Sequence, residues 1–421
     1  MENKVRPDGV AGLKKHTMKP VQIAFMLFCL VAAGAFGIED MIPLSGPGLT
    51  IAILIIFAII WAHPISQVVS ELSALMPAEG GIYVWVKEAL GEFWGFCMGW
   101  WGTLSIYLCS AAYVVLIVGY AADYILPTIA GLCSIGSWEE WGTEGVGYGD
   151  VLVECLGYGW GVAFMVVAIA SQAAIFNAYI AAGSRGFFVM ADDYLCPKFL
   201  VKVSKKRGIP VLSILLLGLT TAIMMNFDFT VLLVIVGPLA LMIYVILGIA
   251  LLIIRKKYPV EGRDCWYIKG GNVKVWAYAL APMIIAVLAL LVNGTEYFLL
   301  GFVSIGSGAV FYVIFKWMYG GLAKIDAEKY PVNPKTKLAK GDLQRLGVFV
   351  LAFGIYAVIG SFFLVWYEGS WGPEYYEWMY GDTFLMSDFW LMIKVGKIGG
   401  AIATVAGAVL LAIGKKTDPV K

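Results

Sequence analysis

The sequence predicts an all-α polytopic membrane protein with about ten transmembrane helices. Its 421 residues are 61% hydrophobic and only 14% charged, whereas about a quarter of the residues in a soluble globular domain are charged. The chain also contains about ten apolar runs of roughly 20 residues, the length that a helix needs to cross a bilayer. These runs lie near 19–42, 46–75, 92–126, 154–182, 210–226, 228–255, 275–294, 296–318, 345–368 and 390–414.

The positions of the basic residues support this count. Short cytoplasmic loops carry more lysine and arginine than the loops on the other side of a membrane. When alternate segments are assigned to the cytoplasm, they hold all of the 30 lysines and arginines except Lys394 and Lys397. An even number of spans follows, with both termini cytoplasmic. The predicted divisions are a basic tail at 1–20, a transmembrane domain at 21–320, and a cytoplasmic loop with two further spans at 321–421.

The first apolar run is interrupted by Gly34 and Gly37, and Glu39 and Asp40 follow directly. A helix in lipid must satisfy its own backbone hydrogen bonds, so these residues favour an unwound segment that faces protein or a water-filled cavity. The amides and carbonyls freed there can bind a solute or an ion. Alternatively, the glycines only permit close helix packing and the carboxylates lie at the outer interface.

The next two spans carry their own irregularities. Pro64, inside the second run, predicts a kink because proline lacks a backbone N–H. Glu71, in the cytoplasmic half of the same run, either lines the inner half of a pathway or caps the inner edge of the helix. Gly91, Gly95 and Gly99 recur at every fourth position, which predicts a flat ridge for another helix.

Several short motifs follow one another in the first half of the chain. They are Gly37-Ile38-Glu39-Asp40, Glu71 to Pro77, Gly80 to Trp85, Gly91 to Trp101, Ser184-Arg185, Met190-Ala191-Asp192-Asp193, Pro197 to Leu200 and Gly208-Ile209-Pro210. Together they resemble the amino acid–polyamine–organocation (APC) superfamily, and most closely its polyamine-uptake branch of polyamine:cation symporters. The resemblance covers about half of the chain and implies a LeuT-type fold with a broken first helix.

The resemblance also exposes a difference in length. Members have twelve spans, arranged as two inverted five-helix repeats plus two. Here the match to the third span is followed, near 120–132, by sequence similar to the loop before the eighth span. Family spans four to seven are therefore expected to be missing, including the broken sixth span that faces the first. Outside the core match, Gly396 and Gly400 predict a helix-packing face in the last span.

The resemblance implies a set of site residues. The unwound segment would receive a substrate carboxylate on its backbone N–H groups, or would hold an amine through two carboxylates. Two aromatic rings of the third run either close over a cationic amine or pack in the core. Polar side chains of the run at 154–182 either join the site or bond to a neighbouring helix. The candidate substrate-binding residues are Gly34, Ala35, Phe36, Gly37, Glu39, Asp40, Trp101, Tyr107, Gln172 and Asn177, and the candidate ion-coupling residues are Ser171 and Glu71.

Two outer segments, Trp138 to Trp141 and Trp371 to Tyr380, are rich in aromatic and acidic residues. They either form an interfacial belt, or the acidic residues in and near them concentrate a cationic substrate at the mouth of a pathway through their electric field. These acidic residues are Glu139, Glu140, Glu144, Asp150, Glu368, Glu374 and Glu377.

The leading functional prediction is a secondary active permease for amino acids or polyamines in a prokaryotic cell membrane, driven by a proton or cation gradient. The alternative is a shortened, transport-inactive relative that acts as a membrane scaffold or partner subunit. The sequence predicts neither an enzyme nor a metal site, because no nucleophile–base pair is visible and the seven cysteines lack metal-ligand spacing. A net charge of +1 gives no reason to expect nucleic acid. The expected partners are a small amine or amino acid and the lipid bilayer, with no cofactor apart from a coupling H⁺ or Na⁺, and oligomerisation is left open.

Overall fold

The structure is a computed structural model that describes residues 41–125, 157–227, 229–381 and 388–417, together with the single positions 19, 21, 153 and 156. Across these residues the chain is helical, with one isolated β-bridge between Val332 and Ala339. The predicted interruption at 31–40 lies outside the described residues.

The connections between the described helices differ in length, and the longest described one runs from the end of α11 to the start of α12. A π-helical turn, Ala58–Ala62, joins the first two, and 3-10 turns lie at Lys198–Val201 and Gly321–Lys324. The helices are α2 (Met41–Phe57), α3 (His63–Leu75), α4 (Ile82–Leu90), α5 (Glu92–Ile125), α7 (Tyr158–Asp192), α8 (Val211–Met224), α9 (Phe229–Lys257), α10 (Gly271–Val292), α11 (Thr295–Tyr319), α12 (Asp342–Glu368), α13 (Gly372–Tyr380) and α14 (Phe389–Thr417).

These helices confirm the predicted fold class. Within the described residues, 8 helices are long and apolar enough to cross a membrane, with Gly48–Leu75 counted as one. Helix α8 has 14 residues and corresponds to the shortest of the predicted runs. Every predicted run from 46–75 onward thus has its helix, and the chain is an all-α polytopic membrane protein.

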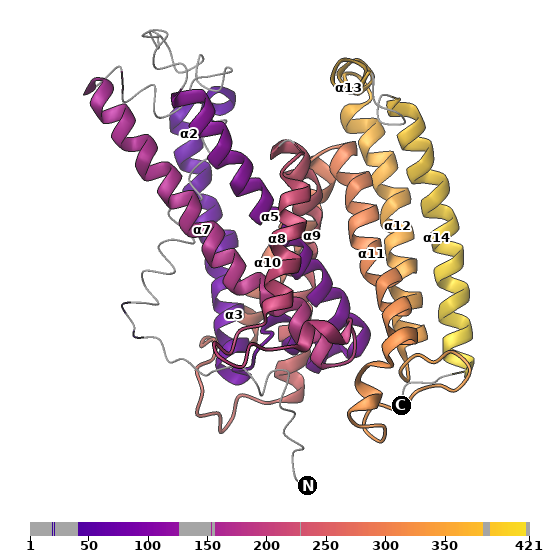
Figure 1. Ribbon diagram of the computed structural model, residues 1–421. Coiled ribbons are helices and arrows are strands. Elements are labelled where there is room, and N and C mark those ends of the chain that lie inside the picture. The colour runs from indigo at the N-terminus through magenta and orange to yellow at the C-terminus, as the bar shows by residue number, and fades with distance from the viewer. Residues whose placement is uncertain are drawn as a thin grey trace.

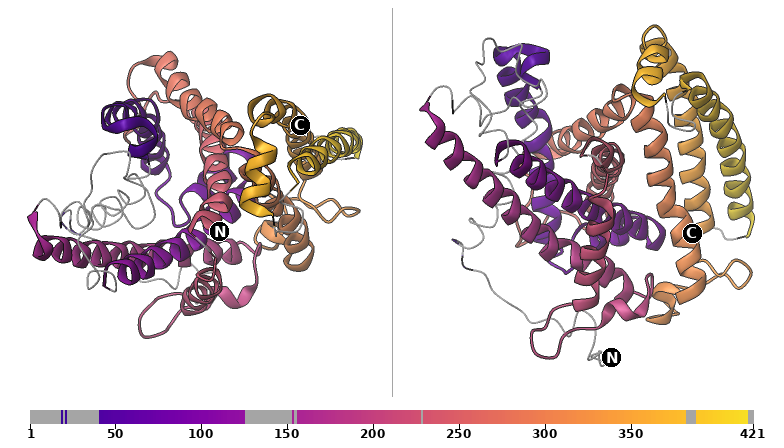
Figure 2. Two further views of the ribbon diagram at one scale, coloured as in Figure 1. Left: turned by 90° about the horizontal axis from the view of Figure 1, so that it is seen from above. Right: turned by 45° about the horizontal axis from the view of Figure 1, so that its top comes forward.

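The helices form a bundle with a separate pair at one edge. Helices α5 and α9 lie at its centre, where α5 packs on α4, α7 and α9, and α9 packs on α10 and α11. Helix α7 crosses the bundle obliquely, while α11, α12 and α14 stand side by side (Figure 1). Seen from above, α12 and α14 lie at one edge of the molecule (Figure 2). The loops after α7, α9 and α11, which carry many lysines and arginines, lie at the same end, which we call the basic end (Figure 1).

The irregularity predicted at Pro64 is present one turn earlier. The π-helical turn Ala58–Ala62 ends directly before α3, and Pro64 lies in the first turn of that helix. Proline is tolerated there because the first N–H groups of a helix have no partner inside it. Such a turn interrupts the regular ladder of hydrogen bonds, so it can bend a helix without leaving polar groups exposed to lipid.

The three glycines of the predicted ridge have two different roles. The first forms the turn between α4 and α5, and the other two form a contact surface on α5. Gly91 ends α4 with a φ of 94°, a value that favours glycine. A Cβ atom on Gly95 would lie 2.9 Å from the Cα of Lys87, and one on Gly99 would lie 2.7 Å from the sulfur of Met190. Gly95 and Gly99 therefore let α4 and the end of α7 pack closely on α5, as predicted.

The closest helix pair joins α12 and α14, and it confirms the packing face predicted in the last span. A Cβ atom on Gly400 would lie 2.7 Å from the Cβ of Ala357. Further along, a Cβ on Gly354 would lie 2.4 Å from the backbone nitrogen of Thr404, and one on Gly407 would lie 2.2 Å from that of Leu351. The backbones are in contact because both faces lack side chains, and in lipid this close packing is what holds two helices together.

Substitution of Gly407 by leucine is expected to separate α12 from α14, because backbone atoms cannot move aside as a flexible side chain can. Overpacking of this kind costs about 1–3 kcal/mol or more. The thermal unfolding temperature in detergent measures the loss. Gly399→Leu is the matched control, since a Cβ at Gly399 has nothing within 4 Å, and it should leave this temperature unchanged. Equal losses in both variants would contradict the proposed packing.

At the opposite end of the bundle, Glu368 caps helix α11. Its carboxylate accepts hydrogen bonds from the backbone N–H of Thr295 at 3.2 Å and from the hydroxyl of Thr295 at 2.5 Å. An anion at a helix N-terminus is stabilised by the free N–H groups and by the helix dipole. Glu368 is 1% exposed, so its carboxylate serves as a helix cap and cannot contact a cation in the outer solvent directly, while the effect of its field stays a prediction. Glu374 and Glu377 are exposed.

Candidate functional site

Half of the predicted site residues cannot be placed. Gly34, Ala35, Phe36, Gly37, Glu39 and Asp40 lie outside the described residues, so the unwinding of the first helix stays a prediction. The remaining candidates lie on three described helices, α3, α5 and α7.

The two aromatic candidates, Trp101 and Tyr107, are packed inside the core. Both lie on α5 and are at most 1% exposed. The indole N–H of Trp101 donates to the carbonyl of Ile305 at 2.9 Å. The Tyr107 hydroxyl donates to the carbonyl of Ser213 at 3.4 Å, and its ring meets Phe187 edge to face. In this conformation both rings pack in the core, which is the second of the two alternatives that the sequence left open.

The three polar candidates on α7 do not share one face. Gln172 is fully buried, Ser171 is half-buried and Asn177 is exposed. Residues five apart on a helix differ by about 140° in direction, which is why Gln172 and Asn177 point to different surroundings. A single site on α7 can therefore include Gln172 with one of its neighbours, but not all three side chains.

Glu71 is the centre of a buried ion cluster at the basic end. One carboxylate oxygen accepts hydrogen bonds from Arg255 at 2.7 Å and from Arg263 at 3.1 Å. The other accepts from Arg255 at 2.6 Å and from the backbone N–H of Ile268 at 3.0 Å. A carboxylate offers about four lone-pair positions, and all four are occupied. Glu71 thus ties α3 to α9 and the following loop, and the ion-coupling role remains a prediction that would require this cluster to open.

A second buried pair, which the sequence reading missed, joins α5 to α11. Lys316 and Glu92 are 0% and 2% exposed, with 2.5 Å between the ammonium and carboxylate. Next to them, Asp342 accepts hydrogen bonds from the Tyr312 hydroxyl and, at 2.8 Å, from Arg345. The sequence did contain an indication of this pair, because Lys316 lies inside an apolar run and a lysine there is expected to have a partner. Its partner could not be read from the sequence.

A third contact joins two of the motifs that carry the family resemblance. The Tyr83 hydroxyl donates to Asp193 at 2.6 Å, and Lys87 forms an ion pair with the same carboxylate. Burial, followed by the charge of Asp193, raises the pKa of Tyr83 well above its usual range. Tyr83 lies in the segment Gly80 to Trp85, and Asp193 ends the segment Met190 to Asp193. These motifs meet because both helix ends reach the basic end of the bundle.

A more exposed cluster forms around Glu88 of α4. Lys257 pairs with its carboxylate, and the Tyr258 hydroxyl donates to it at 2.8 Å. Partial burial raises the pKa of Glu88, but the hydrogen bonds from Lys257 and Tyr258 outweigh that effect and leave the pKa below its ordinary value. With the three buried clusters, this pair makes the basic end the most polar and most strongly cross-linked end of the described bundle.

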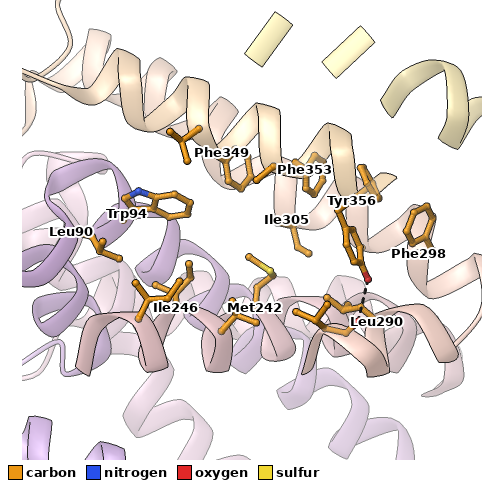
Figure 3. Close-up of a pocket in the computed structure, with 17 residues that line it drawn as sticks. Leu90, Trp94, Met242, Ile246, Leu290, Phe298, Ile305, Phe349, Phe353 and Tyr356 are labelled. Atoms are coloured by element: carbon orange, nitrogen blue, oxygen red, sulfur yellow. Dashed lines mark hydrogen bonds between the residues drawn. The ribbon is translucent and has the colours of Figure 1, made fainter. Parts of the chain in front are cut away.

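A large apolar cavity lies above these charges. It has a volume of about 490 Å³ and lies between α12 on one side and α9, α10 and α11 on the other (Figure 3). The one hydroxyl on its wall, that of Tyr356, donates to the carbonyl of Val287 at 3.3 Å. An ammonium group entering here would lose its water and meet no carboxylate among the lining residues. The aromatic rings offer about 2 kcal/mol per cation–π contact, which is less than the cost of burying an unpaired charge. The cavity therefore does not suit a polyamine. Its lining residues are Leu90, Trp94, Met242, Val245, Ile246, Ile249, Val287, Leu290, Phe298, Gly301, Phe302, Ile305, Val348, Phe349, Ala352, Phe353 and Tyr356.

A polar pocket of about 380 Å³ lies at the basic end. It contains both carboxylate and cationic groups and is formed by the start of α5, the loop after α11 and the start of α12. Neither this pocket nor the apolar cavity has a lining residue on α7. The residues of the polar pocket are Gly91, Glu92, Lys329, Tyr330, Pro331, Ala339, Lys340 and Arg345.

The fold and its buried charges define a multi-pass membrane protein of the helical-bundle class. The family model for amino acid permeases matches residues 19–131 and 122–323, which together are most of the chain. The chain belongs to this family of permeases, which are not enzymes. The two matched segments meet at 122–131, where the sequence predicts the shortening, although the absence of particular family spans stays a prediction.

Its relatives support the resemblance to the polyamine branch. Polyamine transporter PUT1 of Oryza sativa subsp. japonica is 37% identical over 129 residues, which are 30% of this chain and 24% of that protein. Polyamine transporter RMV1 of Arabidopsis thaliana is 39% identical over 108 residues, 26% of this chain and 22% of that protein. An uncharacterized transporter of Mycobacterium tuberculosis (strain ATCC 25618 / H37Rv) is 31% identical over 102 residues, 24% of this chain and 22% of that protein.

The matched regions thus span about a quarter of the length of the curated relatives. No solved structure matches the chain.

Proposed function

We propose that this protein is a secondary active permease that moves a small amine or amino acid across the cell membrane. The observation that carries the proposal is the family match over residues 19–131 and 122–323. The polyamine transporters among the relatives favour a polyamine as the substrate. A proton or cation gradient would supply the energy, as the resemblance to the polyamine:cation symporters implies.

In this proposal, the substrate binds at the unwound first helix. Glu39 and Asp40 would hold the ammonium groups, because a polyamine has no carboxylate for the backbone N–H groups to receive. The ion cluster around Glu71 would close the basic end of the pathway. A second role for Glu71, in ion coupling, would require its hydrogen bonds to Arg255 and Arg263 to break during the cycle.

Uptake into proteoliposomes tests the proposal. Labelled putrescine, a neutral amino acid and a cationic amino acid are compared, each with and without a pH gradient. Asp40→Asn is expected to lower putrescine uptake at least tenfold, because a buried amine loses its charge partner. Glu71→Gln, normalised to folded protein in the vesicles, should retain uptake when Glu71 only ties the helices together, whereas loss of the gradient-driven part of uptake would support its ion-coupling role. Equal uptake by the two variants and the unmodified chain would remove the outer carboxylates from the mechanism.

A second candidate function is a transport-inactive membrane scaffold or partner subunit. It is favoured by the short matched length, about a quarter of the curated relatives, and by the close packing of Trp101 and Tyr107 in the core. It predicts no gradient-driven uptake of any of the three substrates by folded, correctly inserted protein. Uptake of one substrate above empty vesicles excludes it.

A further inference from the structure

The apolar cavity opens to the outside at membrane depth. Two of its lining side chains, Val287 and Val348, are 37% and 46% exposed. They lie on α10 and α12, both of which are long and apolar enough to span the bilayer. The neighbouring solvent at this depth is therefore lipid hydrocarbon, and an apolar space that opens to it favours an acyl chain over water or a polar solute.

The cavity is elongated along α12. Its lining runs along this helix from Val348 to Tyr356, about 12 Å at 1.5 Å per residue. A long apolar space of this kind suits an extended acyl chain.

At its lower end the cavity lies next to the polar pocket. Leu90 lines the cavity and the next residue, Gly91, lines the pocket. On α12, Arg345 of the pocket lies one turn before Phe349 of the cavity. A Cβ atom on Gly91 would lie 2.9 Å from the guanidinium carbon of Arg345, so this side chain packs on Gly91 where α5 and α12 begin, and the two spaces are adjacent there.

The polar pocket has an excess of positive charge. Glu92 is neutralised by Lys316, and Arg345 by Asp342. Lys329 and Lys340 are exposed, and neither forms an ion pair with a carboxylate of the described residues. Lys329 also lies against the Tyr330 ring, 5.3 Å from its centre. Two exposed lysines in a pocket next to an apolar cavity match the two parts of an anionic lipid, since each basic residue near a membrane surface attracts such lipids by about 1 kcal/mol.

We propose that this site binds one anionic phospholipid. An acyl chain occupies the apolar cavity between α9, α10 and α12, and the headgroup phosphate lies between Lys329 and Lys340. The lipid fills the space between the central bundle and the α12–α14 pair, so it holds the pair against the bundle. None of the residues that line this site belongs to the predicted substrate segment Gly34 to Asp40.

Native mass spectrometry of the delipidated full chain, titrated with phosphatidylglycerol or phosphatidylcholine, tests the headgroup part. The unmodified protein should bind one phosphatidylglycerol more tightly than phosphatidylcholine. The double variant Lys329→Ala/Lys340→Ala should lose about 25-fold in affinity for phosphatidylglycerol, about fivefold for each lysine. Lys202→Ala/Lys205→Ala, on the loop after α7, removes the same charge at the same end and should change nothing. Equal affinity for both lipids, or equal losses in both double variants, would overturn the proposal.

The acyl-chain part is tested by Ala352→Trp, which fills the cavity from an exposed position on its wall. This variant should lose binding of phosphatidylglycerol at least tenfold while keeping the unfolding temperature of the lipid-free protein. Glycerol phosphate, which has the headgroup without the chains, should not compete. Competition by glycerol phosphate would identify a site for soluble phosphate instead. A change in oligomeric state caused by Ala352→Trp would identify the cavity as a contact between two copies of the chain, and either result would overturn the proposal.

Discussion

Replacement of Glu71 by alanine is expected to lower the free energy of unfolding by about 3–5 kcal/mol. The side chain is 1% exposed, and its partners Arg255 and Arg263 are 13% and 6% exposed. Removal of the carboxylate leaves two guanidinium groups without a counter-charge where little water reaches them, and it leaves the N–H of Ile268 without its acceptor. Chemical unfolding in detergent measures the loss.

Glu79→Ala is the matched control for this prediction. Glu79 also pairs with an arginine, Arg185, at 3.1 Å, but the two side chains are 36% and 51% exposed. Exposed pairs of this kind contribute about 0–1 kcal/mol, because water and salt screen them. If both variants lose the same stability, the cluster around Glu71 is not the buried anchor that the structure describes.

Replacement of Lys316 by methionine should have an effect of similar size. The carboxylate of Glu92 would stay buried without its cation, which costs about 3–5 kcal/mol. The double variant Lys316→Met/Glu92→Gln removes both charges, so it should regain most of this loss. A double-mutant cycle on the free energy of unfolding measures the coupling between the two side chains.

The exposed pair of Lys257 and Glu88 provides the comparison for that cycle. Their side chains are 48% and 30% exposed, and a cycle of Lys257→Met with Glu88→Gln should give a coupling below about 1 kcal/mol. If the losses from Lys316→Met and Glu92→Gln simply add, the two residues do not depend on each other, and the buried pair contributes nothing as a unit.

The sequence predicted the secondary structure well because the membrane restricts the choice. A segment in lipid must satisfy its own backbone hydrogen bonds, so an apolar run of sufficient length forms a helix whatever packs beside it. The small residues of the last span gave its packing face for a similar reason, since Gly400 and Ala357 leave room for a neighbouring backbone. The irregularity at Pro64 was predictable because proline lacks an N–H, but its form as a π-helical turn was not.

The polar contacts of the candidate site were harder to predict. Glu71 could be seen as a charge at an inner helix edge, yet its partners lie 184 and 192 positions further along the chain. Glu368 resembled a surface charge in an outer loop, and only the position of Thr295 beside it makes it a helix cap. The apolar cavity could not be predicted from the sequence, because each side chain that lines it is of a type that is common at membrane-facing and core positions.

The sequence by itself determined the class of protein, the helices from 46–75 onward and the membership of the amino acid permease family, because helix formation in lipid and short motifs depend on neighbouring residues. The tertiary structure alone decided which charges are paired, which aromatic rings are buried, and where the apolar cavity lies next to the polar pocket. These properties depend on side chains brought together from distant helices, and the order of residues along one chain does not specify those contacts.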